Sequence, residues 1–104
     1  MALIKNIGDE AGKLLKRVIR HKDPIVAELL INWGKVVGVK FASSTYPLKT
    51  IKFKEKNQYK KLLIVNASNS SLAMEFSFQQ DIIIERIAVY MGYKAVHKIQ
   101  VRTL

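Results

Sequence analysis

The spacing of apolar residues along this chain of 104 residues changes three times, and this pattern constrains the fold more than any other feature. Apolar residues recur every three or four positions up to about residue 37, alternate with polar residues over 48–54, return to helical spacing over 72–91 and alternate again near the end. The first spacing is typical of amphipathic helices, and alternation is typical of half-buried strands. We therefore predict an α+β protein in the order helix, helix, strand, strand, helix, helix, strand. Its small three-stranded sheet, antiparallel or mixed, carries helices on one face.

Two helices are predicted before the first strand. The first covers roughly residues 3–20, and its apolar stripe consists of Ile4, Ile7, Ala11, Leu14 and Val18. We expect this stripe to face the core, and a dimer seam is the alternative. Four basic residues fall mainly off the stripe and form a basic flank near the end of the helix, where the helix dipole favours cations. They are Lys13, Lys16, Arg17 and Arg20, and the last three are candidate nucleic-acid contacts.

The second predicted helix starts after Asp23, which can cap it, with Pro24 in the first helical position. Its apolar stripe runs through Trp33 to Val37, and Gly38 is expected to end it. An exposed Trp33 would offer a surface on which a base can stack. Because Trp33 lies at helical spacing within an apolar stripe, we predict instead that it packs in the core.

The middle of the chain predicts an antiparallel hairpin. Its first strand covers 48–54, with Ile51 and Phe53 on one face and polar side chains on the other. Residues 55–59 form the turn, and the apolar run 61–67 is typical of a strand with a neighbour on each side. Lysines then crowd the tip and outer side of the hairpin around one aromatic ring. The candidate nucleic-acid contacts there are Lys49, Lys52, Lys54, Lys56, Tyr59, Lys60 and Lys61.

Two helices and a closing strand are predicted for the rest of the chain. Residues 79–81 interrupt the helical pattern, with Asp81 capping the second helix, and one long bent helix is the alternative. The second helix buries Ile87 and ends at Gly92. The closing strand alternates over 96–101. We expect the open face of the sheet to carry four cations, Lys52, Lys54, Lys98 and Arg102.

The charge of the chain is strongly positive and clustered. Eighteen Lys and Arg against eight Asp and Glu give a formal net charge of +10. Segment 1–22 contributes +4 and segment 48–62 contributes +5, so nine of the ten excess charges lie in two places. Clustered cations favour a polyanionic partner, with nucleic acid first. The excess is mostly Lys, 14 against 4 Arg, and the composition of an AT-rich genome is the alternative explanation.

The chain lacks the groups that common catalytic and metal sites need. It has no cysteine, which excludes disulfides, thiolate zinc sites and cysteine nucleophiles. Neither His21 nor His97 has metal-ligand spacing around it, and His97 is expected to pack. No apolar run reaches the roughly 18 residues of a membrane helix, and the acid pair at Asp9 and Glu10 does not fit a secretory signal. We therefore predict a cytoplasmic, non-enzymatic single domain over 1–104 without metal or cofactor.

Three motifs occur in a fixed order along nearly the whole chain. The chain opens with Gly8-x-x-x-Gly12-Lys13-Leu14-Leu15, and Trp33-x-x-Val36-Val37-Gly38 is followed by Tyr46-Pro47. The longest motif is Ile83-Ile84-Glu85-Arg86-Ile87-x-x-Tyr90-x-Gly92-Tyr93-x-Ala95-Val96. In this order and spacing the motifs resemble those of the DciA family, whose members are bacterial replicative-helicase loaders. The longest motif is most similar to that of alphaproteobacterial members.

The resemblance implies a K-homology-like fold, DNA binding and an interaction with a DnaB-type helicase. A K-homology domain usually clamps the nucleic-acid backbone with a Gly-x-x-Gly loop between two helices. The matching place here, about residues 78–81, reads Phe-Gln-Gln-Asp. Binding is therefore expected to use the Lys-rich hairpin or the first helix. Many family members also carry a C-terminal extension that helps to engage the helicase, and we expect this chain, which ends at Leu104, to lack it.

These observations favour a DNA-binding accessory of the replicative helicase. Single-stranded DNA is slightly favoured, because Tyr59 can stack a base. An RNA- or ribosome-associated module is the first alternative, and a protein-interaction domain without nucleic-acid binding is the second. The sequence leaves open the oligomeric state, the choice between DNA and RNA, and the surface that contacts the helicase.

Overall fold

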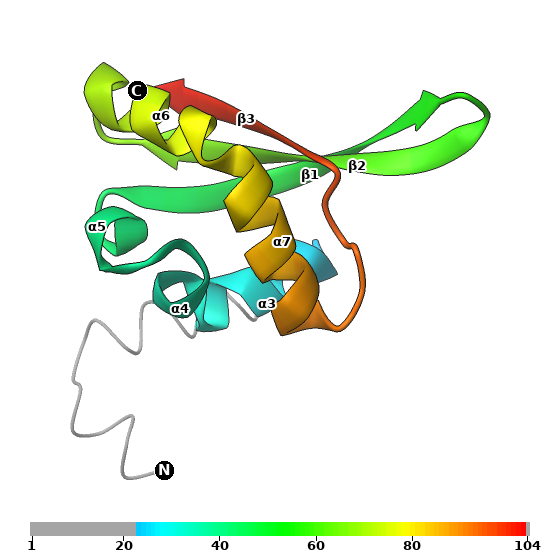
Figure 1. The fold of residues 1–104 in the computed structure, drawn as a ribbon, viewed down its shortest axis with the longest axis horizontal. Helices are drawn as coiled ribbons and strands as arrows, with labels where there is room; N and C mark the ends of the chain where they lie inside the picture. The colour runs from blue at the N-terminus through cyan, green and yellow to red at the C-terminus, as the bar shows by residue number, and fades with distance from the viewer. Residues whose placement is uncertain (1–22, 104) are drawn as a thin grey trace, which may run out of the picture.

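The structure, a computed structural model, describes residues 23–103. In that part of the chain five helices accompany three strands (Figure 1). The helices are α3 (Pro24–Ile31), α4 (Trp33–Val37), α5 (Val39–Ala42), α6 (Ser70–Phe78) and α7 (Gln80–Met91). The strands are β1 (Thr45–Glu55), β2 (Gln58–Ala67) and β3 (Lys98–Thr103). The helix predicted over residues 3–20 lies outside the described residues.

The three strands form one mixed sheet with β2 in the middle. β1 pairs with β2 in the antiparallel direction, whereas β3 pairs with β2 in parallel after the crossover through α6 and α7. Leu63, Val65 and Ile99 point from one face of this sheet into the core, where they join the buried side chains of the helices. The predicted α+β architecture, with helices on one face of a small sheet, is confirmed.

Helix α3 starts where the sequence predicts. One carboxylate oxygen of Asp23 accepts hydrogen bonds from the backbone N–H groups of Ile25 (3.0 Å) and Val26 (3.3 Å). The prediction of one helix as far as Gly38 is wrong, because Asn32 leaves the helical conformation at φ −132° and ψ 34°. Its side chain there donates a hydrogen bond to the Tyr90 hydroxyl (3.0 Å), a tertiary contact that an apolar stripe cannot indicate. Gly38, at φ 90°, ends α4, and α5 follows directly.

The hairpin of β1 and β2 is longer than predicted and turns through Lys56 and Asn57. These residues have φ angles of 50° and 63°, the positive values that a two-residue type I′ turn requires. The strand pairing shifts between Pro47 and Lys49, and beyond that bulge the hairpin extends past the helices (Figure 1). Ile51 lies opposite Leu62, on the sheet face away from the core residues Leu63 and Val65, and it is 39% exposed.

Helices α6 and α7 are separated at Gln79, which confirms the predicted interruption. Asp81 is not the cap of α7, because only one residue separates the two helices. Gln79 therefore occupies the cap position, and Asp81 lies in the first turn. Gly92 ends α7 in the left-handed conformation (φ 84°). The closing strand begins at Lys98, two residues later than predicted.

Trp33 lies in an aromatic cluster in the core. It is only 6% exposed, and its ring centroid is 6.2 Å from that of Phe76. Its Nε1–H group donates to the carbonyl and hydroxyl oxygens of Thr45, both at 3.1 Å, so the buried indole nitrogen has its hydrogen bonds. Phe76 also contacts Phe41 edge to face at 5.1 Å. The cluster ties α4 and α6 to the start of β1, and it leaves no exposed indole on which a base can stack.

Candidate nucleic-acid interface

The pairing of β1 with β2 sorts the hairpin side chains into two faces. Lys52 lies opposite Lys61, and Lys54 lies opposite Tyr59. Directly opposite residues share a face of a sheet, and successive residues alternate between faces. We call the set Lys52, Lys54, Tyr59 and Lys61 the tyrosine face. It continues, beyond the helices, the side of the sheet that buries Leu63 and Val65.

The other side of the sheet carries a second set of side chains. Phe53 lies opposite Lys60, Glu55 lies opposite Gln58, and Lys98 of β3 lies beside Leu62 of β2. We call this the phenylalanine face. Its candidate residues are Lys49, Phe53, Glu55, Lys60, Lys98 and Arg102.

The tyrosine face gathers unpaired cations around an exposed ring. Tyr59 is 67% exposed. The Lys52 ammonium lies 4.7 Å from the centroid of its ring and the Lys54 ammonium lies 5.7 Å from it, both within cation–π distance. Within residues 23–103, no carboxylate forms an ion pair with Lys52, Lys54 or Lys61. This face therefore presents three uncompensated positive charges beside an accessible aromatic surface.

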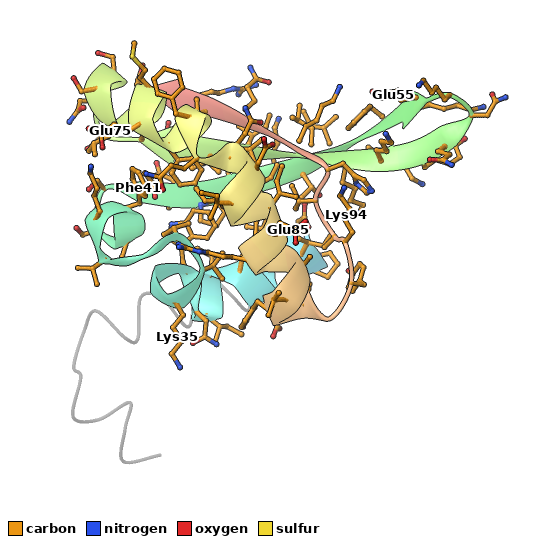
Figure 2. The ribbon with its side chains drawn as sticks, in the orientation of Figure 1. Lys35, Phe41, Glu55, Glu75, Glu85 and Lys94 are labelled. Atoms are coloured by element: carbon orange, nitrogen blue, oxygen red, sulfur yellow. The ribbon has the colours of Figure 1, made fainter. Side chains whose placement is uncertain are left out.

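The phenylalanine face is partly neutralised by one carboxylate, that of Glu55. Its two oxygens contact the ammonium groups of Lys60 (3.3 Å) and Lys98 (3.1 Å), and Figure 2 shows Glu55 towards the far end of the hairpin. Hydrogen bonds from Lys98 and then from Lys60 lower the pKa of Glu55 below its ordinary value, so it carries its negative charge at neutral pH. Lys98 also lies 5.2 Å from the Phe53 ring centroid. A phosphate approaching this face meets a carboxylate as well as cations.

The expectation that one sheet face carries Lys52, Lys54, Lys98 and Arg102 together is wrong. Lys52 pairs with Lys61, whereas Lys98 and Arg102 pair with Leu62 and Asn66. Positions 61 and 62 of β2 point to opposite faces, because successive side chains of a strand alternate. The four cations are therefore divided between the two faces. Lys56 lies at the tip, and the candidates Lys16, Arg17 and Arg20 lie outside the described residues.

The sequence analysis did not predict two side chains that take part in the hairpin surface. They are the carboxylate of Glu55 and the ring of Phe53. Glu55 reads as part of a turn and Phe53 as a buried strand residue. A two-residue loop at Lys56 and Asn57 would have fixed the register of the hairpin and placed both correctly. The local sequence does not signal this loop, because it lacks the Asn-Gly or Asp-Gly pair that marks a type I′ turn.

His97 fastens the start of β3 to the hairpin. Its backbone N–H donates to the Lys61 carbonyl (2.9 Å), and its ring Nδ1 accepts from the Lys61 N–H (3.1 Å). Desolvation, followed by the charges of Lys94 and Lys60, lowers the pKa of His97. The neutral imidazole that can accept this hydrogen bond is thereby favoured. His97 thus acts as a backbone partner that holds Lys98 beside Glu55.

Residues 78–81, which the family resemblance matches to the clamp of a K-homology domain, lie at the junction of α6 and α7. They include Phe78, whose side chain is 82% exposed, and Gln79 at the break between the helices. Within residues 23–103 there is no cluster of three or more His, Cys, Asp or Glu side chains that could hold a metal ion. None of the helices in that same region is long and apolar enough to span a membrane.

Comparisons with known proteins place the chain among relatives over nearly its whole length. The family model described as "Dna[CI] antecedent, DciA" matches residues 6–101. An uncharacterised protein of Rickettsia prowazekii (strain Madrid E) is 34% identical over 98 residues, which cover 94% of this chain and 91% of that protein. The matched region includes the hairpin, both helices that flank position 79, and β3 as far as Val101.

Proposed function

The chain belongs to the DciA family, a family related to the loading of DnaB-type helicases, and on that premise we propose that it is a DNA-binding accessory of the bacterial replicative helicase. In this role it is not an enzyme. It binds DNA in the cytoplasm and helps to recruit or load the helicase during replication. The observation that carries the DNA-binding part is the tyrosine face, with three uncompensated lysines around an exposed ring.

The geometry of the tyrosine face suits a single strand. An unpaired base can stack on the exposed ring of Tyr59, while the ammonium groups of Lys52 and Lys54 reach the phosphates on either side. Such contacts neutralise the backbone and read no base edges, so binding is weakly selective for sequence. In a duplex the bases are already stacked on one another, and Tyr59 has no free base to receive. We therefore expect single strands to bind more tightly than duplexes.

The phenylalanine face is the weaker candidate for phosphate contacts. Glu55 lies between Lys60 and Lys98 and remains ionised at neutral pH. A phosphate bound there must either displace this carboxylate or accept its repulsion. Lys49 and Arg102 lie on the same face and can assist binding only from its periphery.

The test is fluorescence anisotropy with labelled single-stranded and duplex oligonucleotides. The variant Lys52→Glu/Lys54→Glu/Lys61→Glu reverses the charge of the tyrosine face. We expect it to lose about 100-fold or more in affinity at low salt, because three phosphate contacts become repulsive. The matched control, Lys35→Glu/Lys40→Glu/Lys94→Glu, has the same net charge and leaves the hairpin intact. An equal loss of affinity in both triple variants would mean that binding depends only on net charge, and it would contradict the assignment of DNA binding to this face.

Two further measurements separate the proposal from its alternatives. Competition by an RNA strand of matched sequence tests the RNA-binding alternative, since RNA preference requires contacts to the 2′-hydroxyl group. Capture of the replicative helicase by the tagged chain, after nuclease treatment, tests the helicase part independently of DNA. Helicase capture without any oligonucleotide binding would support a protein-interaction domain and overturn the DNA-binding role.

A further inference from the structure

The phenylalanine face repeats, on the opposite side of the hairpin, the ring and cation that define the tyrosine face. The Lys98 ammonium lies 5.2 Å from the centroid of the half-buried Phe53 ring, a cation–π distance like those around Tyr59. Ile51 and Leu62 lie opposite each other beside this ring, and neither is fully buried. A partly accessible ring among apolar side chains and cations is the kind of surface on which proteins stack the bases of a single strand.

The cations of the phenylalanine face form a row along β2. Every second position of this strand, from 60 to 66, either is a cation or has one directly beside it on a neighbouring strand. In this order they are Lys60 itself, Lys98 beside Leu62, Lys49 opposite Ile64, and Arg102 beside Asn66. Positions 60 and 66 are about 20 Å apart at the rise of a strand. A row of regularly spaced cations suits the repeating phosphates of a nucleic-acid backbone.

The two faces carry the same excess of positive charge. Three lysines belong to the tyrosine face, and no carboxylate within residues 23–103 pairs with them. The row on the phenylalanine face has four cations against one carboxylate, that of Glu55, which also leaves an excess of three. The faces therefore differ in the presence of this carboxylate and not in their total attraction for a polyanion.

The carboxylate of Glu55 lies where a phosphate would bind. Its two oxygens contact Lys60 of β2 and Lys98 of β3, and a phosphate can offer two oxygens to the same ammonium groups. The side chains of Glu55, Lys60 and Lys98 are 39%, 27% and 57% exposed, so a strand in solution can reach all three. Exposed ion pairs of this kind are weak, and a phosphate can displace Glu55 at little cost.

We propose that the phenylalanine face is a second binding site for a single DNA strand, so that one chain holds two strands on opposite sides of its hairpin. The inference rests on the proposed function, because it takes the tyrosine face as the site of the first strand. At the second site a base stacks on Phe53, and phosphate oxygens replace the Glu55 carboxylate between Lys60 and Lys98. Because only this site requires the exchange, the second strand binds more weakly than the first.

The shape of the hairpin keeps the two strands apart. Tyr59 and Phe53 point to opposite faces, and the hairpin that carries them extends past the helices (Figure 1). A single strand on both faces would have to fold back around the tip at Lys56 and Asn57. A second strand along the row of cations needs no such bend. The two faces are therefore suited to two separate strands.

A bridging assay with the full chain tests the proposal. One oligo(dT) strand of about ten nucleotides is immobilised, a fluorescent copy of it is added in solution, and the retained fluorescence is measured as the protein concentration rises. Because oligo(dT) does not pair with itself, retention requires the protein. We expect retention to rise and then fall, since excess protein supplies each strand with a chain of its own. Native mass spectrometry should detect one chain with two strands.

Neutralising the row separates the second site from the first. The variant Lys60→Gln/Lys98→Gln/Arg102→Gln leaves Glu55 on the face without these three cations. We expect it to lose bridging by roughly tenfold or more. Its affinity for the first strand, measured by anisotropy, should fall by less than about threefold at physiological salt, where charges on the far side of the hairpin are screened. The matched control with equal charge change, Lys35→Gln/Lys40→Gln/Lys94→Gln, should bridge like the wild type.

Removing the carboxylate should act in the opposite direction. Glu55→Gln keeps the four cations and removes the group that a phosphate must displace. We expect bridging to increase by a few-fold, because the second strand no longer competes with an internal anion. Bridging that falls or stays the same in Glu55→Gln would contradict the exchange between carboxylate and phosphate.

The outcomes distinguish this proposal from the proposed function. Tight binding of one strand per chain without bridging would overturn the second site and leave the proposed function standing. An equal loss of bridging and of first-strand affinity in the Lys60/Lys98/Arg102 variant would also overturn it, since one strand would then contact both faces. Complexes of two chains with two strands, without one chain holding two, would assign bridging to a protein dimer and overturn it as well. A wild-type chain that binds no strand would overturn the proposed function itself.

Discussion

The ammonium group of Lys98 lies 3.1 Å from a carboxylate oxygen of Glu55, and this contact joins the edge strand β3 to the far part of the hairpin. The other oxygen of Glu55 contacts Lys60, so one acid restrains two cations on the phenylalanine face. Glu55 thus partly neutralises the phenylalanine face, whereas within residues 23–103 no carboxylate pairs with the lysines of the tyrosine face.

Replacing Glu55 by Gln should strengthen DNA binding. The substitution removes a negative charge and releases Lys60 and Lys98 from their ion pairs, so the phenylalanine face becomes available to phosphates. We expect a rise of a few-fold in affinity at low salt, measured by anisotropy, with little change in thermal stability because exposed ion pairs contribute little. The control Glu75→Gln removes an acid that pairs with Lys40 away from the hairpin. A weaker affinity for Glu55→Gln would show that the carboxylate orders the site rather than blocking it.

Asp23 should stabilise the fold through both the α3 cap and its hydrogen bonds to Thr50. Its second carboxylate oxygen accepts from the Thr50 N–H (2.8 Å) and from the Thr50 hydroxyl. We expect Asp23→Ala to lower the free energy of unfolding by about 1–2 kcal/mol, measured by urea denaturation. Asp81→Ala is the matched control, because Asp81 lies in the first turn of α7 without capping it. An equal loss in the two variants would contradict the anchoring role.

The stability that Asp23 provides should depend on pH in the acidic range. Burial by itself raises the pKa of this carboxyl, but hydrogen bonds from Thr50, Val26 and Ile25 outweigh it and hold the pKa below 3.8. A lowered pKa means that the contribution is present above the pKa of the unfolded chain, and that it is lost as the pH falls through the folded pKa. The difference in unfolding free energy between the wild type and Asp23→Asn should therefore shrink below about pH 4. A difference that stays constant down to pH 2 would contradict this pKa shift.

Replacing Trp33 by Phe should destabilise the fold and leave the side chains of the tyrosine face unchanged. The smaller ring leaves a gap against Phe76, and the Thr45 carbonyl loses its indole donor. We expect a loss of about 2 kcal/mol in unfolding free energy. At temperatures where the variant is folded, its affinity for oligonucleotides should equal that of the wild type. Loss of DNA binding by a folded Trp33→Phe variant would indicate that a base stacks on Trp33.

Replacing Asn57 by Gly should stabilise the hairpin slightly. Asn57 has a φ of 63°, a conformation that glycine adopts without steric cost and that favours a type I′ turn. We expect a gain of about 0.5 kcal/mol, because relief of the left-handed conformation exceeds the entropy that an added glycine gives to the unfolded chain. DNA affinity should stay unchanged, since no charge is altered. A loss of stability would indicate that the Asn57 side chain contributes to the turn.

The sequence predicts the kinds of element well and the faces of the sheet poorly. Capping signals work where the local chemistry is sufficient, as at Asp23 and Gly92. The local sequence does not predict the break at Asn32, because the Asn32 side chain bonds to Tyr90, 58 residues away. Helical periodicity predicts the inner stripe of α7 but does not account for the exposed apolar side chains of Ile82 and Val89 on its outer side.

The faces of the hairpin could not be predicted because they depend on register. A single residue of slip moves every side chain to the other face. The register here follows from a two-residue turn without glycine and from a bulge at Leu48, neither of which local composition signals. The parallel pairing of β3 with β2, which places Lys98 beside Glu55, depends in turn on the crossover through two helices.

The salt dependence of binding to single-stranded DNA tests the central claim most directly. Each lysine that neutralises a phosphate contributes about 0.7 to the slope of log affinity against log salt concentration. Replacing Lys52, Lys54 and Lys61 by Gln should therefore reduce the magnitude of the wild-type slope by about 2. The same neutralisation at Lys35, Lys40 and Lys94 should leave the slope nearly unchanged. An unchanged slope in the tyrosine-face variant would contradict the claim that DNA binds there.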